Sequence, residues 1–524
     1  MQDNKDKIFL ITVKDGRACE AKNDETVLSA LARSGIALSA PCGGRGICGK
    51  CHIILREGTI RLIDESRTQI KPGDTFSACR GIPLSDITVE LEDENIVLDS
   101  RKNKNQKGVK ILHAGAGIDI GTTTVQLELI CLDTGNTLET ISLFNAQRSF
   151  GADVMSRIKA AKNGKTKELF TAINRQIEGM LQHCINSWAL SGIEQCTISG
   201  NTTMLHLFCG IDPSSMGEVP FTPVFLEDRH YSGKELSLSA DNITVLPGIS
   251  AFVGADIVSG LAYIDILNQK EDSLFVDIGT NGEMALWKKD KKKLLSCSTA
   301  AGPCFEGAEI TCGMGALPGA INHILLKEKI NANGPLSYTT LENIPPKGMC
   351  GSGLIDAIAA MLQLKAIDET GALSDEYAEE GFPLAEGIRL CQKDIRQFQL
   401  AKSAILSGIT ILCKKAGIEN LSSLGTVYIA GGLGFFINVQ SAVTAGLLPK
   451  EFAGSSAGIK INGNTGDFRT AVCGNTSLNG AVKSLREPAF ISRCREIIAL
   501  SNTMELAREN DFTEVFAENM YFPS

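Results

Sequence analysis

Four cysteines near the start of the chain have the spacing of a metal site. Cys42, Cys48 and Cys51 follow the pattern Cys-x5-Cys-x2-Cys, and 27 residues separate Cys51 from Cys79. A short loop can direct three thiolates at one centre only if its backbone curls, which the glycines of PCGGRGICGKC allow. Structural zinc sites usually use two Cys-x2-Cys pairs, and this pattern has one. The spacing therefore favours a [2Fe-2S] cluster with these four cysteines as its ligands.

Two similar segments further along the chain indicate a second kind of chemistry. GIDIGTTTVQLELI, residues 117–130, and FVDIGTNGEMALW, residues 275–287, both read as a strand, an Asp-Ile-Gly-Thr turn and a second strand. Such a turn offers backbone N–H groups and hydroxyls to phosphate oxygens, and its aspartate can face a divalent cation. One copy alone is more often an ordinary β-turn. Two copies about one domain apart predict two similar lobes that face each other across a cleft.

The candidate nucleotide-binding residues are those of the two turns and of a later glycine loop. We expect Asp119 and Asp277 to act in catalysis through Mg²⁺. The segment VYIAGGLG, residues 427–434, is a hydrophobic strand that enters a glycine loop, and a loop without side chains would let adenosine lie against the backbone. A plain strand-to-helix turn is the alternative for this segment. The expected ligand-binding residues are Gly121, Thr122, Thr123, Thr124, Gly279, Thr280, Asn281, Gly282, Gly431, Gly432 and Gly434.

Three further acidic residues have two interpretations each. Asp256, in Gly-Ala-Asp, could position magnesium or the attacking water, and it is our third catalytic candidate. We favour its interpretation as the N-cap of a helix that begins at Ile257. Glu306 and Glu309 follow the second turn in a glycine-rich stretch, where they could orient water or form an exposed loop face.

The elements around these motifs predict several domains. Residues 1–98 read as a small α+β unit, with strand IFLITV, helix TVLSALARSGI and closing strand DITVEL. Residues 99–113 contain DSRKNKNQKGVK, which is basic and has no apolar periodicity, so we predict a flexible linker. From residue 114 onward apolar strands alternate with amphipathic helices, which predicts an α/β architecture. We place one lobe at residues 114–273 and a second, with C-terminal helices, at residues 274–524.

Composition restricts the class of protein. The 524 residues are 43% hydrophobic and 21% charged, which is typical of a globular protein. The net charge of -9 argues against nucleic-acid binding, and no apolar run reaches the ~18 residues of a membrane span. The first residues are polar rather than a signal segment. Of the 17 cysteines, 13 remain after a cluster, an odd number typical of reduced thiols, so we expect a cytoplasmic protein.

These motifs together resemble a known family. APCGGRGICGKC with SACRG resembles the [2Fe-2S] ferredoxin domains that have five residues between the first two ligands. The two turns and the glycine loop, in this order, resemble the ATPase fold of actin, Hsp70 and sugar kinases, over residues 114 to about 485. The combination resembles the reductive activators of corrinoid proteins, to which SGNTTMLHLF, FVGADIVSGLA, CGSGLIDAI and DIRQFQLAKSAI are also similar. It implies a ferredoxin-like β-grasp domain followed by a two-lobed α/β ATPase domain.

The resemblance also implies an activity. Such an activator uses MgATP to pass one electron from its cluster to cobalt(II) in a partner corrinoid protein, and so restores cobalt(I) for methyl transfer. An external low-potential donor would reduce the cluster, and a homodimer is an open alternative to a monomer. Longer family members have an additional middle domain, for which residues 99–113 leave no room.

Two other functions stay open at this point. One is an activator of a radical 2-hydroxyacyl-CoA dehydratase, in which Cys350 and Cys391 would be ligands of a second cluster. The other is a nucleotide-gated redox sensor or scaffold, which binds a partner without driving electron transfer.

Overall fold

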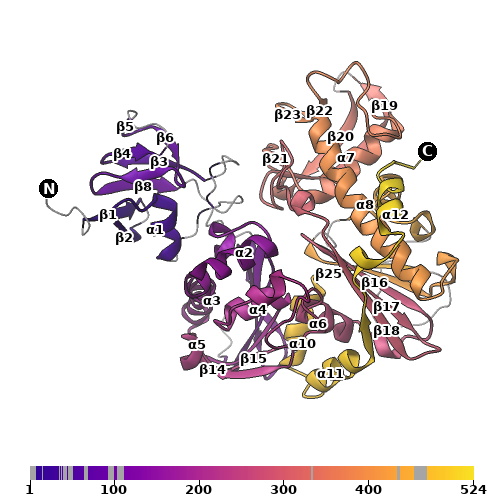
Figure 1. Ribbon diagram of the computed structural model, residues 1–524, viewed down its shortest axis with the longest axis horizontal. Coiled ribbons are helices and arrows are strands. Elements are labelled where there is room, and N and C mark those ends of the chain that lie inside the picture. Colours follow the sequence, from indigo (N-terminus) through magenta and orange to yellow (C-terminus); the bar gives the residue numbers. More distant parts are fainter. Residues whose placement is uncertain are drawn as a thin grey trace. The chain divides into compact units, whose positions relative to one another are not determined.

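The computed structural model describes residues 7–523 except 15, 35, 37, 39–43, 45, 47–50, 64–68, 92–98, 103–110, 332–333, 433–436 and 454–468 (Figure 1). The chain forms two compact units. The first unit contains residues 1–247 and 484–488, and the second contains residues 248–483 and 489–524. The division falls at residue 248, earlier than our expected boundary at residue 273. In the described part of the chain, no helix is long and apolar enough to cross a membrane.

The N-terminal domain of the first unit is a β-grasp. Its main sheet has the order β2-β1-β8-β3-β6, and β1 and β8 pair in parallel. Alternating side chains of β1, Ile11 and Val13 among them, are buried against α1, whose Leu28 and Leu31 face the same core. The elements are β1 (Ile8–Val13), β2 (Ala18–Lys22), α1 (Val27–Arg33), β3 (His52–Glu57), β4 (Ile60–Leu62), β5 (Gln69–Ile70), β6 (Thr75–Ser77), β7 (Gly81–Pro83) and β8 (Ile87–Leu91).

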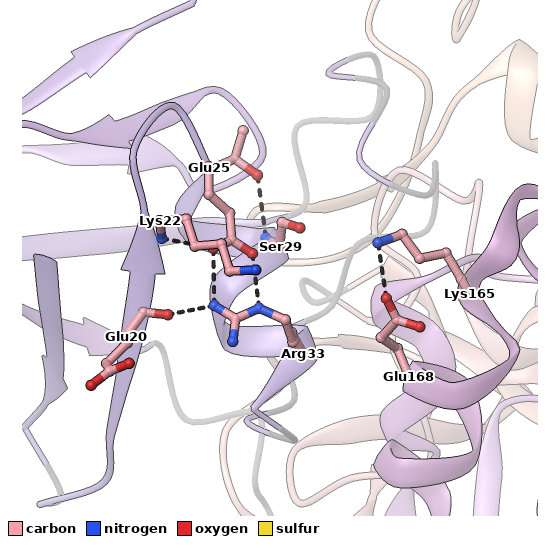
Figure 2. A network of polar contacts seen from close by, with 8 residues as sticks. Glu20, Lys22, Glu25, Ser29, Arg33, Lys165 and Glu168 are labelled. Carbon is pink, nitrogen blue, oxygen red and sulfur yellow. Dashed lines mark hydrogen bonds and ion pairs between the residues drawn. The ribbon is translucent and has the colours of Figure 1, made fainter. Parts of the chain in front are cut away.

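Polar contacts fix helix α1, which leads into the cysteine loop (Figure 2). Thr26 caps the helix by accepting from the Ser29 amide at 3.2 Å. At the other end, the Arg33 guanidinium donates to both Glu25 carboxylate oxygens and to the Glu20 carbonyl. Burial opposes ionisation of Glu25, but its bonds with Arg33 and with the Lys22 amide outweigh this and lower its pKa. The helix is therefore held to β2 at both ends.

The rest of the first unit is built on a seven-stranded sheet of order β14-β15-β13-β10-β11-β12-β9. The long helix α3 and the short helix α4 pack against each other and bury apolar side chains such as Ile177 and Phe208. The elements are β9 (Asp99–Lys102), β10 (Ala114–Ile120), β11 (Thr124–Cys131), β12 (Thr137–Phe144), the 3-10 turn η2 (Ala146–Ser149), α2 (Val154–Ala160), α3 (Thr166–Trp188), β13 (Ile193–Gly200), α4 (Thr202–Phe208), β14 (Arg229–Ser232), α5 (Gly233–Leu236) and β15 (Ala240–Val245).

The start of the predicted linker is a strand. Residues 99–102 form β9, which pairs antiparallel with β12 at the edge of the sheet. The expectation of a flexible segment is therefore wrong for these four residues. Sequence pattern missed them because an edge strand can be polar and still satisfy its backbone through one neighbour. Residues 103–110 lie outside the described residues.

The second unit is built on a six-stranded sheet of order β25-β24-β16-β17-β18-β26. Helix α8 packs on β17 and β18, and α12 packs on α8. The other elements include a separate hairpin, β19 and β20, against α7. The elements are α6 (Ala255–Tyr263), β16 (Ser273–Ile278), β17 (Gly282–Lys288), β18 (Lys293–Thr299), β19 (Ala320–Asn331), β20 (Gly334–Thr340), β21 (Gly348–Met349), α7 (Gly351–Gln363), β22 (Phe382–Ala385), β23 (Ile388–Leu390), α8 (Gln392–Lys415), β24 (Thr426–Ala430), α9 (Val439–Thr444), β25 (Arg469–Gly474), α10 (Thr476–Ser484), α11 (Phe490–Leu500), β26 (Ser501–Thr503) and α12 (Phe512–Glu518).

The two large sheets share the same arrangement of paired strands. In the first, β12, β11 and β10 are antiparallel neighbours, and β13 and β15 then continue in parallel with β10. In the second, β18, β17 and β16 are antiparallel neighbours, and β24 and β25 continue in parallel with β16. This equivalence confirms the internal repeat predicted from the two Asp-Ile-Gly-Thr segments, which occupy the same hairpin in each sheet.

Candidate functional site

The structure describes two of the four cysteines of the motif, Cys51 and Cys79, and places the segments that carry them side by side. Cys51 and Cys79 are both buried, and the Ala78 amide donates to the Cys51 carbonyl at 2.8 Å. A Cβ placed on Gly44 would lie 3.9 Å from the Cys79 Cβ, so Gly44 lies beside this cysteine. Cys42 and Cys48 lie outside the described residues. The positions of Cys51, Cys79 and Gly44 fit a four-thiolate cluster, since such a site needs a curled loop beside a distant fourth cysteine.

The β10–β11 turn, residues 121–124, is held by neutral and cationic groups. Its amide at Gly121 donates to the Thr124 carbonyl at 2.9 Å, which closes the turn. The Asn145 side chain donates to the Gly121 carbonyl at 2.8 Å, and the Asn145 amide donates to the Thr123 carbonyl at 2.8 Å. These bonds fix the backbone shape of the turn.

Two further side chains hold Thr122 in the same turn. Arg157, which is fully buried, donates to the Thr122 carbonyl at 2.5 Å and to the Gly151 carbonyl at 3.0 Å. The Asn201 amide donates to the Thr122 hydroxyl at 3.0 Å. Three consecutive carbonyls of the turn, residues 121–123, thus accept bonds from the protein. Asp119 lies at the end of β10 opposite Gln126.

The β16–β17 turn, residues 279–282, has acidic neighbours instead. The Gly279 amide donates to the Asn281 carbonyl at 2.9 Å, which repeats the closure of the other turn. The Thr280 hydroxyl donates to Glu306 Oε1 at 2.8 Å. Glu306 therefore lies at the turn, whereas Glu309 is exposed.

Asp277 lies against the glycine loop that follows β24. Gly431 has a φ of +97°, and a Cβ placed on it would lie 2.6 Å from Asp277 Oδ1. Only glycine fits such a close approach with that backbone conformation. The structure therefore brings Asp277 and Gly431 together, while Gly434 lies outside the described residues.

Asp277 is one of three acidic residues, with Glu283 and Asp256, that interact electrostatically. Glu283 pairs with Asp277 across the hairpin and is buried. Burial and the nearby charges of Asp256 and Asp277 raise the pKa of Glu283 well above its usual range. The Ser298 hydroxyl donates to Glu283 Oε1 at 3.3 Å. Such a group stays protonated until a cation lowers the local negative potential.

Asp256 is not an N-cap. Helix α6 begins at Ala255 with Gly254 as its cap, and Asp256 lies within the first helical turn. Its effect on the pKa of Glu283 places its charge near Asp277. The alternative interpretation of Asp256 as a helix cap is therefore wrong, because the helix begins two residues earlier, at Ala255 rather than Ile257.

Sequence reasoning missed the residues that support the turns. Asn145, Arg157, Asn201 and Glu283 were not among the candidates, although Asn201 carried a signal. Gly200 ends β13 in the first sheet and Asn201 follows it, and Gly431 and Gly432 follow β24 at the corresponding place in the second. Extending the repeat past the two hairpins would have identified this loop.

The two cysteines considered for a second cluster occupy the N-cap positions of helices. Cys350 precedes α7, is buried, and donates to the Ile321 carbonyl at 3.4 Å. The Cys391 side chain precedes α8 and accepts from the Asp394 backbone, in a capping box. Across the described ranges, no group of three or more His, Cys, Asp or Glu side chains could hold a metal ion. The structure thus gives both thiols a structural role.

Comparison with known proteins agrees with this arrangement. Residues 11–84 match the 2Fe-2S iron-sulfur cluster binding domain, residues 114–269 match the RACo middle region, and residues 271–524 match the C-terminal domain of RACo, the ASKHA domain. A solved structure, the reductive activator for corrinoid,iron-sulfur protein, is 28% identical, with a TM-score of 0.69 over 98% of both chains. The chain belongs to the RACo family of reductive activators of corrinoid proteins.

Two relatives support the membership. The corrinoid activation enzyme RamQ of Eubacterium limosum is 27% identical and aligns over 96% of this chain and 97% of its own length. A [Co(II) methylated amine-specific corrinoid protein] reductase of Methanosarcina barkeri is 28% identical over 64% of this chain and 66% of its own length.

The comparison corrects one expectation. We found no room for a middle domain between residues 99 and 113, but the RACo middle region matches residues 114–269. The family's middle region is thus the segment that we interpreted as the first ATPase lobe. Sequence reasoning assigned it to the ATPase because it contains the first of the two similar Asp-Ile-Gly-Thr segments, at residues 117–130.

Proposed function

We propose that this chain binds MgATP and uses it to pass one electron from a [2Fe-2S] cluster to cobalt(II) in a corrinoid protein, which restores cobalt(I). The observation that carries the proposal is the presence, in one chain of the RACo family, of a cluster-binding domain and two copies of the Asp-Ile-Gly-Thr hairpin sheet. A ferredoxin alone would transfer electrons without nucleotide.

Cys42, Cys48, Cys51 and Cys79 would hold the cluster. When bound, a cluster of this type accepts and donates one electron at a potential near about -400 mV. The protein contributes a buried setting for Cys51 and Cys79, and backbone N–H groups of the glycine loop that can point at sulfur. The loop thereby sets both access and potential.

The two hairpin turns would bind phosphate, each in its own unit. In the first unit, the turn at residues 121–124 has its carbonyls held by Asn145 and Arg157, which leaves its shape fixed before nucleotide arrives. In the second unit, Asp277 and Asp256 would bind Mg²⁺ through water or directly, as Mg²⁺ prefers one or two carboxylates with phosphate oxygens. The glycine loop that begins at Gly431 would accept adenosine.

ATP is needed because the electron transfer is uphill. A cobalt(II)/cobalt(I) couple is expected to lie below the cluster, and each ~59 mV of deficit lowers the yield about tenfold. ATP binding or hydrolysis would favour a conformation that binds the corrinoid protein and alters the axial ligation of cobalt. The nucleotide can do so only if its affinity for that conformation is higher.

The partner would be the corrinoid protein of a methyltransferase system, and an external low-potential carrier would reduce the cluster. The relatives named above support the choice of a corrinoid protein, because one is a corrinoid activation enzyme and another reduces a corrinoid protein. The polar, reduced-cysteine composition supports a cytoplasmic site.

The test is to mix the reduced, cluster-loaded chain with a cobalt(II) corrinoid protein and follow the cobalt(I) absorption with and without MgATP. We expect formation of cobalt(I) to depend on MgATP. Cys48→Ser should abolish electron transfer and spare nucleotide binding, whereas Asp119→Ala should spare the cluster and abolish the ATP dependence. Equal rates with and without MgATP in the unmodified chain would refute the proposal.

A further inference from the structure

One short segment of the first unit contacts both the β10–β11 turn and the ferredoxin-like domain. This bridging segment, residues 145–149, begins with Asn145 and continues as the 3-10 turn η2. At its first residue, the Asn145 side chain and amide donate to the carbonyls of Gly121 and Thr123. The beginning of the segment is therefore bonded directly to the proposed phosphate turn.

The last residue of the bridging segment is bonded to the ferredoxin-like domain. The Ser149 hydroxyl donates to the Leu38 carbonyl at 2.9 Å and accepts from the Leu38 amide at 3.3 Å. Ser149 and Leu38 are both buried, so these bonds are shielded from water. Leu38 precedes Cys42 by four residues, which puts the contact next to the cysteine loop in the chain.

The bridging segment is also held by one hydrogen bond within itself and by two to helix α3. The Gln147 amide donates to Asn145 Oδ1 at 2.8 Å, and the Gln147 side chain donates to the Leu169 carbonyl at 3.0 Å. The Ala146 amide donates to Gln176 Oε1 at 2.8 Å. A single helical turn with bonds along its whole length cannot shift at one end without moving the other.

We propose that the bridging segment couples nucleotide binding at the β10–β11 turn to docking of the ferredoxin-like domain, with Ser149 as the positioning residue. The proposal rests on the proposed function in one respect, that the turn binds nucleotide. Coupling is reciprocal, so a variant that alters docking through this segment must alter nucleotide affinity by the same factor.

A second contact between the same domains supplies a matched control. Arg175, on α3, donates to the Ser34 carbonyl at 2.6 Å. This contact also joins the ferredoxin-like domain to the part of the first unit that is built on the seven-stranded sheet, but Arg175 lies outside the bridging segment. Removing it should weaken docking and leave the response to nucleotide intact.

The experiment uses the full-length, cluster-loaded chain with saturating Mg²⁺ and the non-hydrolysable ATP analogue AMP-PNP. Calorimetry first establishes binding, and amide hydrogen exchange then follows the Leu38 amide. In the unmodified chain we expect the analogue to change this exchange rate by about fivefold or more, the lower end of typical coupling. In Ser149→Ala the Leu38 amide should exchange fast both with and without the analogue. The affinity for the analogue should shift by the same factor by which its effect on docking is lost. In Arg175→Ala the amide should exchange faster while the fivefold response persists.

A second measurement distinguishes loss of coupling from damage to the fold. The electron paramagnetic resonance spectrum of the reduced cluster should respond to the analogue in the unmodified chain and in Arg175→Ala, but not in Ser149→Ala. Two outcomes would overturn the coupling and leave the proposed function standing. One is that the analogue binds to the unmodified chain without changing the exchange rate of the Leu38 amide. The other is that Ser149→Ala still shows the full response to the analogue. Failure of the unmodified chain to bind the analogue would instead overturn the proposed function, and this inference with it.

Discussion

The two Asp-Ile-Gly-Thr turns share a backbone and differ in what surrounds it. Both are closed by the same amide-to-carbonyl bond, from Gly121 to Thr124 and from Gly279 to Asn281. The side chains that form hydrogen bonds with the β10–β11 turn carry amide groups and a guanidinium. Around the β16–β17 turn they are carboxylates, with Glu283 buried beside Asp277. The two turns thus share a backbone geometry and differ in the charge of the side chains around it.

We infer from this difference that the two turns have different roles. A turn whose carbonyls are held by Asn145 and Arg157 has a fixed shape, which suits binding of phosphate without reorganisation. A turn beside the carboxylates of Asp277 and Asp256 has a negative setting, which suits a divalent cation. The first turn is expected to respond to mutation mainly in stability and coupling, and the second mainly in turnover.

The largest effect is expected from the buried arginine of the first turn. Arg157→Met would leave the carbonyls of Thr122 and Gly151 buried without a donor, so the first unit should lose about 3–4 kcal/mol of unfolding free energy. Urea denaturation monitored on the first unit measures this. A loss below about 1 kcal/mol would show that the turn does not depend on its guanidinium.

The first unit should also be sensitive to acid through His206, which lies in α4 after Asn201. Burial lowers the pKa of His206 to about 4, from the usual 6.5. The unfolded chain therefore binds the proton first, so stability is present above pH 6.5 and is lost as the pH falls toward 4. The loss amounts to about 3 kcal/mol, and urea midpoints across this range measure it. His206→Gln should flatten the dependence, and an unchanged pH profile in this variant would contradict the assignment.

The acidic turn should respond in catalysis. Asp277→Asn keeps the shape of the side chain and removes its charge, so ATP hydrolysis should fall about 100-fold and the Mg²⁺ requirement should rise. Steady-state assays at varied Mg²⁺ measure both. Glu283→Gln is the matched control, because the raised pKa of Glu283 means that its carboxyl is already neutral before metal binds. An equally large loss in Glu283→Gln would show that Glu283 acts as an anion.

The smallest effect is expected at the hydroxyl beside that turn. Thr280→Val removes the bond to Glu306 and should cost the second unit about 1 kcal/mol, with turnover reduced less than about tenfold. Thermal unfolding and the ATPase assay measure these together. A turnover loss comparable to that of Asp277→Asn would give the hydroxyl a direct catalytic role.

Much of the architecture was predictable from local pattern. The strands of the ferredoxin-like domain, the two hairpins and the strand before Gly431 all follow hydrophobic periodicity and glycine placement, which act over a few residues. The start of α6 was not predictable, because Gly254 offers no side-chain cap. Strand β9 was also missed, because its polar residues gain a partner only when β12 is beside them.

The sequence by itself predicted the residues that we expect to carry the chemistry. Cysteine spacing and a repeated Asp-Ile-Gly-Thr segment are local signals, since one loop or one turn supplies most of the atoms of each site. Only the tertiary structure decided what surrounds those turns. Asn145, Arg157 and Asn201 reach the β10–β11 turn from separate elements, and Glu283 acquires its raised pKa from burial and from the charges of Asp256 and Asp277. Electrostatics and bracing of this kind depend on through-space distance, which sequence separation does not encode.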